Sequence, residues 1–200
     1  LKDTFPSTHL KTLEIIKEKS SILDLGCNDG ELAKRLKNKN CIVTCVDKNI
    51  NFENKEKEDN FINHDLNKGP PDLDYKKFDY IVFLDVIEHL SDPEIFMDKL
   101  KEKLKNNSKI KILISTPNIA FIVMRIMLLF GFFNYGKRGI LDKTHTRLFT
   151  FSSFKKLFIN YFDIQETKGI PIPFPLALGD NIFSRLLLKI NIFLIKISKP

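Results

Sequence analysis

Residues 21–47 constrain the fold more than any other part of this 200-residue chain. They begin with a short apolar run, 22–25, that stops at Gly26. A run of β-branched and leucine residues that ends on glycine is typical of a buried parallel strand entering a tight turn. Apolar residues then recur at helical spacing, namely Leu32, Ala33 and Leu36. A second apolar run, 41–46, ends on Asp47, so the segment predicts a strand, a turn, a helix and a second strand.

Two glycines and one acid make this unit suitable for a nucleoside ligand. Gly26 and Gly30 allow φ values that a Cβ disfavours, and they let the backbone approach a ligand closely. The helix that begins near Gly30 directs its free N–H groups toward the crevice. Asp47 ends the second strand, where a carboxylate accepts hydrogen bonds from two ribose hydroxyls.

Residues 24–30 read Asp-Leu-Gly-Cys-Asn-Asp-Gly. This sequence resembles the first motif of the class I S-adenosylmethionine-dependent methyltransferases, whose usual form is Asp-x-Gly-x-Gly-x-Gly. Asn28 stands at the middle glycine, and because Asn tolerates the left-handed region we expect the turn to persist. The resemblance extends to about Phe162 and implies an α/β, Rossmann-like, doubly wound and mostly parallel sheet.

The same resemblance implies S-adenosylmethionine as cofactor and assigns residues to its parts. Four residues of the first turn would surround the methionine part: Asp24, Gly26, Cys27 and Gly30. Asp47 and the adjacent Lys48 would hold the ribose. Asp65 and Leu66 would flank the adenine, and Leu84 and Asp85 would lie under the reacting centre.

Further apolar runs predict the remaining elements. Helices are expected at 8–19, 94–105 and 152–160, and strands at 61–66, 78–84, 110–115 and 161–167. Residues 49–60 are charged and lack apolar periodicity, which predicts a solvated loop or a loose helix. The expected domain organisation is an N-terminal helix at 1–20, a methyltransferase domain at 21–168, and a proline-rich segment with an amphipathic helix at 169–200.

Residues 119–133 are strongly apolar, with Arg125 the only charge. The run is shorter than the roughly 20 residues that a membrane span requires. We expect a helical cap over the active-site rim, inserted after the fifth strand at about 118–150. An interfacial helix in contact with a membrane surface is the alternative.

The C-terminal part departs from the family pattern. Prolines at 171, 173 and 175 exclude an interior strand, and 182–197 predict an amphipathic helix. The antiparallel strand expected last in the family is not visible, so either it lies beyond the given sequence or the sheet has fewer strands. The chain also begins with Leu1, so we interpret the sequence as a fragment of something longer.

A first candidate catalytic site combines Asp85, Glu88 and His89 with the distant His145. The first three fall close together if the segment turns helically after the strand. The pattern resembles the Glu-x-x-Glu-His motif and distant His of metal-dependent small-RNA 2′-O-methyltransferases and of ubiquinone-pathway catechol O-methyltransferases. That resemblance implies Mg or Mn held by Glu88, His89 and His145. The alternative is that the Glu-His pair shapes the cofactor pocket without a metal, as in many methyltransferases.

A second candidate site lies in 141–150, Leu-Asp-Lys-Thr-His-Thr-Arg-Leu-Phe-Thr. This segment resembles methyltransferases of bacterial surface-glycan assembly. His145 is then a base that takes a hydroxyl proton, since its ordinary pKa is near neutrality. The alternative is that His145 and Arg147 only brace the loop through hydrogen bonds.

These observations favour O-methylation of a small molecule or of a sugar hydroxyl in a glycan. A metal-dependent RNA 2′-O-methyltransferase and a non-catalytic cofactor-binding module are the alternatives. RNA is the weaker one, because the lysines that give the net charge of +7 are spread rather than gathered in a stripe. Three cysteines make no disulfide framework, which favours a reducing cytoplasm.

Overall fold

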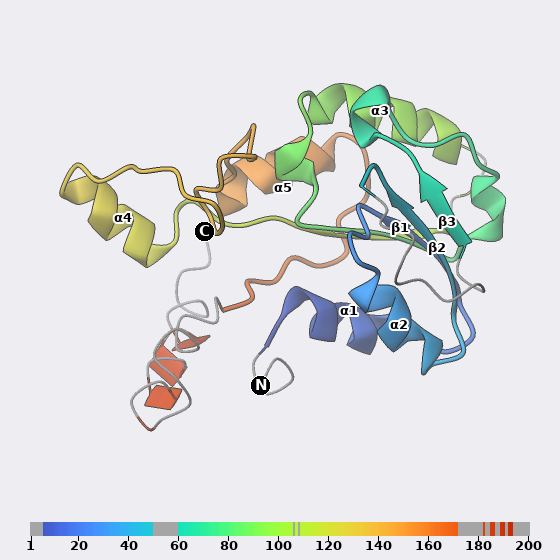
Figure 1. Ribbon diagram of the computed structural model, residues 1–200, viewed down its shortest axis with the longest axis horizontal. Coiled ribbons are helices and arrows are strands. Elements are labelled where there is room, and N and C mark those ends of the chain that lie inside the picture. The colour runs from blue at the N-terminus through green and yellow to red at the C-terminus, as the bar shows by residue number, and fades with distance from the viewer. Residues whose placement is uncertain are drawn as a thin grey trace. The chain divides into compact units, whose positions relative to one another are not determined.

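A computed structural model describes residues 6–49, 60–105, 107 and 109–171, with helical residues 182, 185–186, 189–190 and 192–193 (Figure 1). The chain divides into two compact units. One comprises residues 16–163, and the other comprises 1–15 together with 164–200. The larger unit holds the whole sheet and every candidate site residue.

Five parallel strands form one sheet in the order β3-β2-β1-β4-β5. Their bounds are β1 (Ser21–Leu25), β2 (Ile42–Asp47), β3 (Asn60–Asn63), β4 (Tyr80–Leu84) and β5 (Lys111–Ser115). β1 and β4 lie in the centre and are almost wholly buried, which accounts for their apolar sequences. The predicted Rossmann-like parallel sheet is confirmed.

Helices on both faces of the sheet complete the fold. α2 (Glu31–Lys37) covers one face and α3 (Pro93–Leu104) covers the other (Figure 1). The Asp92 side chain accepts a hydrogen bond from the Ile95 N–H, and Pro93 stands in the first turn, as the sequence predicts. α5 (Phe151–Ile159) joins α3 at its far end, where Lys101 donates to the Asn160 carbonyl at 3.0 Å.

Two predicted helices are shorter in the structure. α1 (Thr8–Ile15) ends earlier than predicted, and α4 (Ile122–Leu129) occupies only the middle of 119–133. The Ile119 N–H donates to the Phe149 carbonyl at 2.8 Å, so both ends of the chain stretch that carries α4 meet. Figure 1 shows α4 apart from the strands of the sheet. Its role as a cap therefore stays a prediction.

The predicted strand at 161–167 is wrong. These residues are described without ladder pairing. A strand requires a hydrogen-bonded neighbour, and the antiparallel strand expected beside it does not occur among the described residues.

Some predictions fall outside the described residues. Residues 50–59 include most of the predicted charged stretch, and residues 172–181 include most of the proline-rich segment. Most of the predicted helix at 182–197 lies outside the description as well. In the described part of the chain, every helix is too short or too polar to cross a membrane.

Candidate active site

The predicted cofactor residues follow strands whose carboxyl ends meet at one edge of the sheet. β1 ends at Leu25, β2 at Asp47 and β4 at Leu84, and all run parallel. In open parallel sheets, ligands bind outside this edge. The fold thus brings the first turn, Asp47 and Asp85 to the same rim.

The turn after β1 is left-handed at three positions. Gly26, Asn28 and Gly30 have φ values of 78°, 49° and 75°. The expectation for Asn28 is thereby confirmed. The reason for Gly26 differs from the one inferred from sequence, because a Cβ there would lie 2.4 Å from Cγ2 of Val86. Packing against the segment after β4 thus excludes a side chain at Gly26 whether or not a ligand is bound.

Asp47 holds the turn together with both carboxylate oxygens. Oδ2 accepts a hydrogen bond from the Asn28 N–H at 2.9 Å, and Oδ1 accepts one from the Asn49 N–H at 2.9 Å. Asp47 therefore has a structural role besides the predicted ribose contact.

Asp24 is a carboxyl group in the core of the sheet. It is 4% exposed, and burial raises its pKa to about 7, with the negative charge of Asp47 adding to the effect. A cationic group placed beside it would favour its ionised form. The nearby Cys27 is buried as a free thiol.

Asp65 and Leu66 follow the end of β3, the strand that pairs with β2. Asp65 Oδ1 accepts hydrogen bonds from both the backbone and the side-chain nitrogen of Asn67, and it caps the 3₁₀ turn η2 (Leu66–Lys68). The backbone hydrogen bond from Asn67 is the main cause that lowers the Asp65 pKa. Leu66 is buried. The predicted adenine contact stays a prediction.

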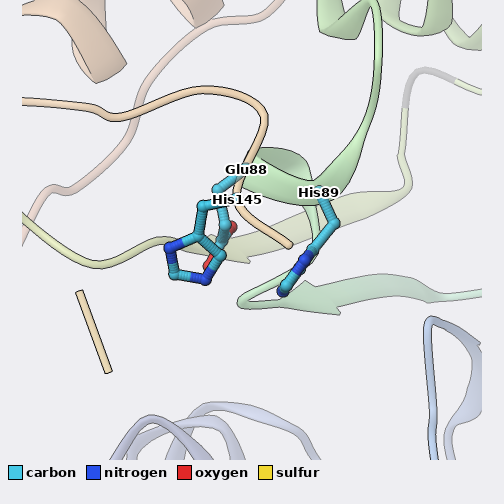
Figure 2. Close-up of side chains that lie close together, drawn as sticks. All are labelled: Glu88, His89 and His145. Carbon is cyan, nitrogen blue, oxygen red and sulfur yellow. The ribbon is translucent and has the colours of Figure 1, made fainter. Parts of the chain in front are cut away.

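Glu88, His89 and His145 come together at the rim (Figure 2). One ligand-type atom from each lies within 4.8 Å of the other two. The two imidazole rings stack edge to face, with centroids 4.7 Å apart and planes at 72°. Glu88 and His89 belong to the 3₁₀ turn η4 (Ile87–His89), and His145 reaches them from the loop before α5. The structure thus brings together three of the four residues for which the sequence predicted convergence, and their role as catalytic or metal-binding residues stays a prediction.

Asp85 is not part of this group. It has a φ of 55°, and the 3₁₀ turn begins only at Ile87, so no helical face joins Asp85 to Glu88 and His89. Its Oδ1 instead accepts a hydrogen bond from the Ser115 hydroxyl at 2.8 Å, and its N–H donates to the Ser115 carbonyl at 3.0 Å. The prediction of a helical turn directly after β4, which would place Asp85 beside Glu88 and His89, is therefore wrong.

Hydrogen bonds fix the tautomer of both histidines. Nδ1 of His145 lies 2.9 Å from the Ile140 carbonyl, and Nδ1 of His89 lies 3.2 Å from the Thr144 carbonyl. A carbonyl only accepts, so each neutral ring carries its proton on Nδ1. Each Nε2 then presents a lone pair. Asp142 supports this arrangement by accepting from the Thr144 hydroxyl at 2.7 Å.

Glu88 is a buried acid with one unsatisfied oxygen. The residue is 1% exposed; Oε2 accepts from the Thr116 hydroxyl at 3.1 Å, while Oε1 has no partner among the described residues. Burial raises the Glu88 pKa to about 8. Burial also lowers the His89 pKa. In the free protein near pH 7, Glu88 is therefore mainly protonated and His89 neutral.

The loop that carries His145 is anchored to η4 and α3. The backbone N–H groups of Thr146 and Arg147 both donate to the Glu88 carbonyl, at 2.9 and 3.2 Å. Arg147 pairs with Glu94 on α3. The contacts of Arg147 with Glu94 and of His145 Nδ1 with the Ile140 carbonyl both agree with the bracing alternative, and Nε2 of His145 is not used by either contact.

Sequence reasoning missed the residues that hold the site residues in place. Ser115 positions Asp85, Thr116 positions Glu88, and Thr144 positions His89. Ser115 and Thr116 directly follow the apolar run of β5, and that position was the available signal. Thr144 stands two residues after Asp142, a spacing typical of a local side-chain turn.

Comparison with known proteins gives a consistent result. The family described as a methyltransferase domain matches residues 3–161. A ubiquinone biosynthesis O-methyltransferase of Pelagibacter ubique is 30% identical over 91 residues, which cover 43% of this chain and 38% of the relative. The chain thus matches well under half of that curated relative.

Two solved structures share the fold. A SAM-dependent methyltransferase from Archaeoglobus fulgidus has 21% identity and a TM-score of 0.55, covering 92% of this chain and 86% of that one. The small RNA methyltransferase HEN1 has 19% identity and a TM-score of 0.55, covering 76% of this chain and 20% of that one.

Proposed function

The chain belongs to the methyltransferase-domain family, within the class I S-adenosylmethionine-dependent methyltransferases, and from this premise we propose that it methylates a hydroxyl oxygen of a small molecule or of a sugar in a glycan. The observation that carries the proposal is the pair of imidazoles at the rim, each with its Nε2 lone pair available. The curated relative is itself named an O-methyltransferase, which supports oxygen as the acceptor atom.

When bound, S-adenosylmethionine supplies a methyl group on a sulfonium, and transfer requires alignment and the removal of one proton. We assign the cofactor to the rim through Asp24, Gly26, Cys27, Gly30, Asp47, Lys48, Asp65, Leu66, Leu84 and Asp85. Nε2 of His145 takes the proton from the acceptor hydroxyl. The acceptor oxygen would then receive the methyl group that the cofactor supplies, with the cofactor leaving as the neutral thioether, and His145 would hold the proton that the hydroxyl has lost.

His89 and Glu88 assist this base. His89 stays neutral near pH 7, because burial lowers its pKa, so it adds no positive charge beside His145. Glu88 is held by Thr116 and lies against the pair, where its ionisation would favour a protonated His145. Asp85, fixed by Ser115, faces the reacting centre in this assignment.

Replacing His145 tests the proposal. We expect His145→Gln to lower kcat by about 10²–10⁴-fold, the usual contribution of a general base. Affinity for S-adenosylmethionine, measured by calorimetry, should stay unchanged, because the assigned cofactor residues lie elsewhere. Methyl incorporation is measured against a panel of nucleotide sugars, glycans and small phenols. Full activity in His145→Gln on an acceptor that the wild type methylates would refute the assignment.

A metal-assisted form of the same reaction has its own supporting observation. Glu88 Oε1 is buried and unpartnered, and it stands beside two imidazoles. One carboxylate and two neutral imidazoles suit Zn or Mn better than Mg, so the donor set fits an ion. Glu88, His89 and His145 would hold it, and it would bind neighbouring acceptor oxygens and make one of them more acidic.

Metal binding is tested without relying on activity. The wild type should bind Mn²⁺ or Zn²⁺ in calorimetry and gain thermal stability, and Glu88→Gln should lose both effects. Glu102→Gln is the control, since it makes the same change at an exposed acid on α3, outside this group. Equal binding by Glu88→Gln would exclude this site.

The RNA alternative gains no support from the likeness to HEN1, because at 19% identity that likeness concerns the fold alone.

A further inference from the structure

We propose that the α4 segment (residues 119–141) docks onto an anionic lipid membrane surface. Its large apolar side chains are unusually exposed: Leu129 is 82%, Phe130 69% and Phe132 56% exposed. Others in the same segment are exposed as well: Ile122, Ile126, Leu128, Phe133 and Tyr135. A contiguous apolar surface of this kind marks an interaction site rather than chance exposure.

The exposed residues share one face of the helix. Ile122, Ile126 and Leu129 are spaced by four and three residues, so they lie in one row along α4. Met124, on the other side, is the only buried residue of the helix. Thus α4 uses one apolar side for the protein and presents a second apolar side outward, continued by the aromatic turn after it.

The charges around this face favour anionic lipid headgroups. Arg125, Lys137 and Arg138 are the only charged residues in 119–141, and all three are positive and exposed. Among the described residues, none of the acids forms an ion pair with them. Apolar and aromatic side chains flanked by basic groups are the pattern of a segment that lies in the membrane interface.

A second copy of the chain is a poorer occupant. Two α4 segments packed face to face would bring three positive groups of each copy toward those of the other, with no acid in either segment to offset them. A lipid surface instead supplies the opposite charge. It also accommodates the exposed aromatic side chains of Phe130, Phe132 and Phe133, because aromatic side chains are favoured at the level of the lipid headgroups.

This surface is connected to the candidate active site. The Ile140 carbonyl, at the end of the α4 segment, accepts the hydrogen bond that orients His145. The Ile119–Phe149 bond closes the base of the stretch. Docking through α4 would therefore place the rim beside the membrane, where an acceptor hydroxyl on a lipid-linked molecule is presented.

Vesicle co-sedimentation of the full chain tests the proposal. We expect binding to vesicles of phosphatidylcholine with 30% phosphatidylglycerol, weak binding to pure phosphatidylcholine, and release as the salt concentration rises, on the order of a tenfold loss or more between low and high salt. Ile126→Glu with Leu129→Glu should lower binding at least tenfold. The matched control is Ile95→Glu, on α3, because Ile95 is 52% and Ile126 50% exposed.

A charge variant tests the second half of the proposal. Lys137→Gln with Arg138→Gln should reduce binding to anionic vesicles about tenfold, while Lys76→Gln with Lys77→Gln, an exposed basic pair elsewhere, should not. Circular dichroism and thermal unfolding confirm that each variant is folded. Unaltered binding in the α4 variants, or no binding by the wild type, would overturn the proposal. The proposal would also be overturned if sedimentation velocity showed that the wild type forms an oligomer and that only the α4 variants lose it. In that case α4 would form an interface between copies of the chain. None of these outcomes depends on whether His145 is the base.

Discussion

At the residue scale, Asp47 combines a structural and a proposed binding role. Its carboxylate accepts the Asn28 and Asn49 N–H groups. We expect Asp47→Ala to weaken S-adenosylmethionine binding by about 1–3 kcal/mol, through the loss of charge-assisted hydrogen bonds to the ribose. Calorimetry measures this change directly.

The loss of turn stability must be separated from the loss of a ligand contact. Asp79→Ala is the control, because Asp79 Oδ2 accepts the Ser21 N–H at 2.8 Å at the opposite end of β1. Asp79→Ala should reduce the free energy of unfolding by on the order of 1 kcal/mol, as the loss of the backbone hydrogen bonds of Asp47 should in Asp47→Ala, but it should not change the affinity for the cofactor. Unchanged affinity in a folded Asp47→Ala protein would remove Asp47 from the cofactor site.

Asp24 makes the stability of the free protein depend on pH. Its pKa is about 7 in the folded protein and 3.8 in the reference state, so the folded state binds more protons between these values. The free energy of unfolding should therefore fall as pH rises from about 4 to 7, by about 2–4 kcal/mol. Glu88, whose pKa is raised from 4.5 to about 8, adds a decline in the same direction between about pH 4.5 and 8.

Denaturant unfolding at several pH values checks this expectation. Asp24→Asn should remove the Asp24 part of the decline, and the remaining decline, from about pH 4.5 to 8, is the part that Glu88 causes. A wild-type protein that gains stability over this pH range would show that Asp24 is ionised when folded.

Single residues also show where sequence reasoning stops. Gly26 was recognised as a turn residue, but its contact with Val86 joins two positions 60 residues apart, and no local pattern reveals such a contact. Asp85 was placed with Glu88 and His89 because a helix was assumed after β4. The structure has a left-handed residue there, which only the packing of the strand end decides.

At the scale of elements, apolar runs predicted the five strands, and the signal is clearest for β1 and β4, which are almost wholly buried in the centre of the sheet. β3 at the edge has no buried residue, and its apolar run is correspondingly short. The strand at 161–167 failed for a complementary reason, since strand formation depends on a neighbour and not on the segment alone. Two helices, α3 and α5, begin at a side-chain cap. The start of α3 at Asp92 and Pro93 is an example of a signal that sequence carries fully.

The start of α5 provides an element-scale test. Thr150 and Ser153 form a capping box, in which Thr150 Oγ1 accepts the Ser153 N–H at 3.1 Å and Ser153 Oγ accepts the Thr150 N–H at 2.9 Å. Thr150→Ala should lower stability by about 0.5–2 kcal/mol. Hydrogen exchange should quicken in the first turn of α5. Ser152→Ala, an exposed change in that turn, should have little effect, and equal exchange in the two variants would contradict a capping role.

At the scale of the larger unit, the candidate site depends on contacts between distant parts of the chain. The motif at 24–30 is local, so sequence predicted it. The convergence of His145 with Glu88 and His89 was predicted through resemblance, but the means by which it is held was not. The Glu88 carbonyl receives two N–H groups from residues 146 and 147, and Arg147 reaches Glu94. These contacts join η4, α3 and the loop before α5.

The ion pair between Arg147 and Glu94 should therefore affect catalysis from outside the site. Both side chains are about half exposed, so we expect a coupling free energy of only about 0.3–1 kcal/mol in a double-mutant cycle with Arg147→Ala and Glu94→Ala. The catalytic effect should exceed what this suggests, because the loop that Arg147 anchors carries His145. We expect kcat to fall about 3- to 10-fold in Arg147→Ala, with the affinity for S-adenosylmethionine unchanged.

Lys103→Ala is the matched control. Lys103 lies on α3, like Glu94, and the change breaks its ion pair with Asp72 at 3.0 Å without altering the loop that carries His145. If Lys103→Ala and Arg147→Ala lower kcat equally, the effect belongs to α3 as a whole. If neither changes kcat, the two backbone bonds to Glu88 suffice to position His145.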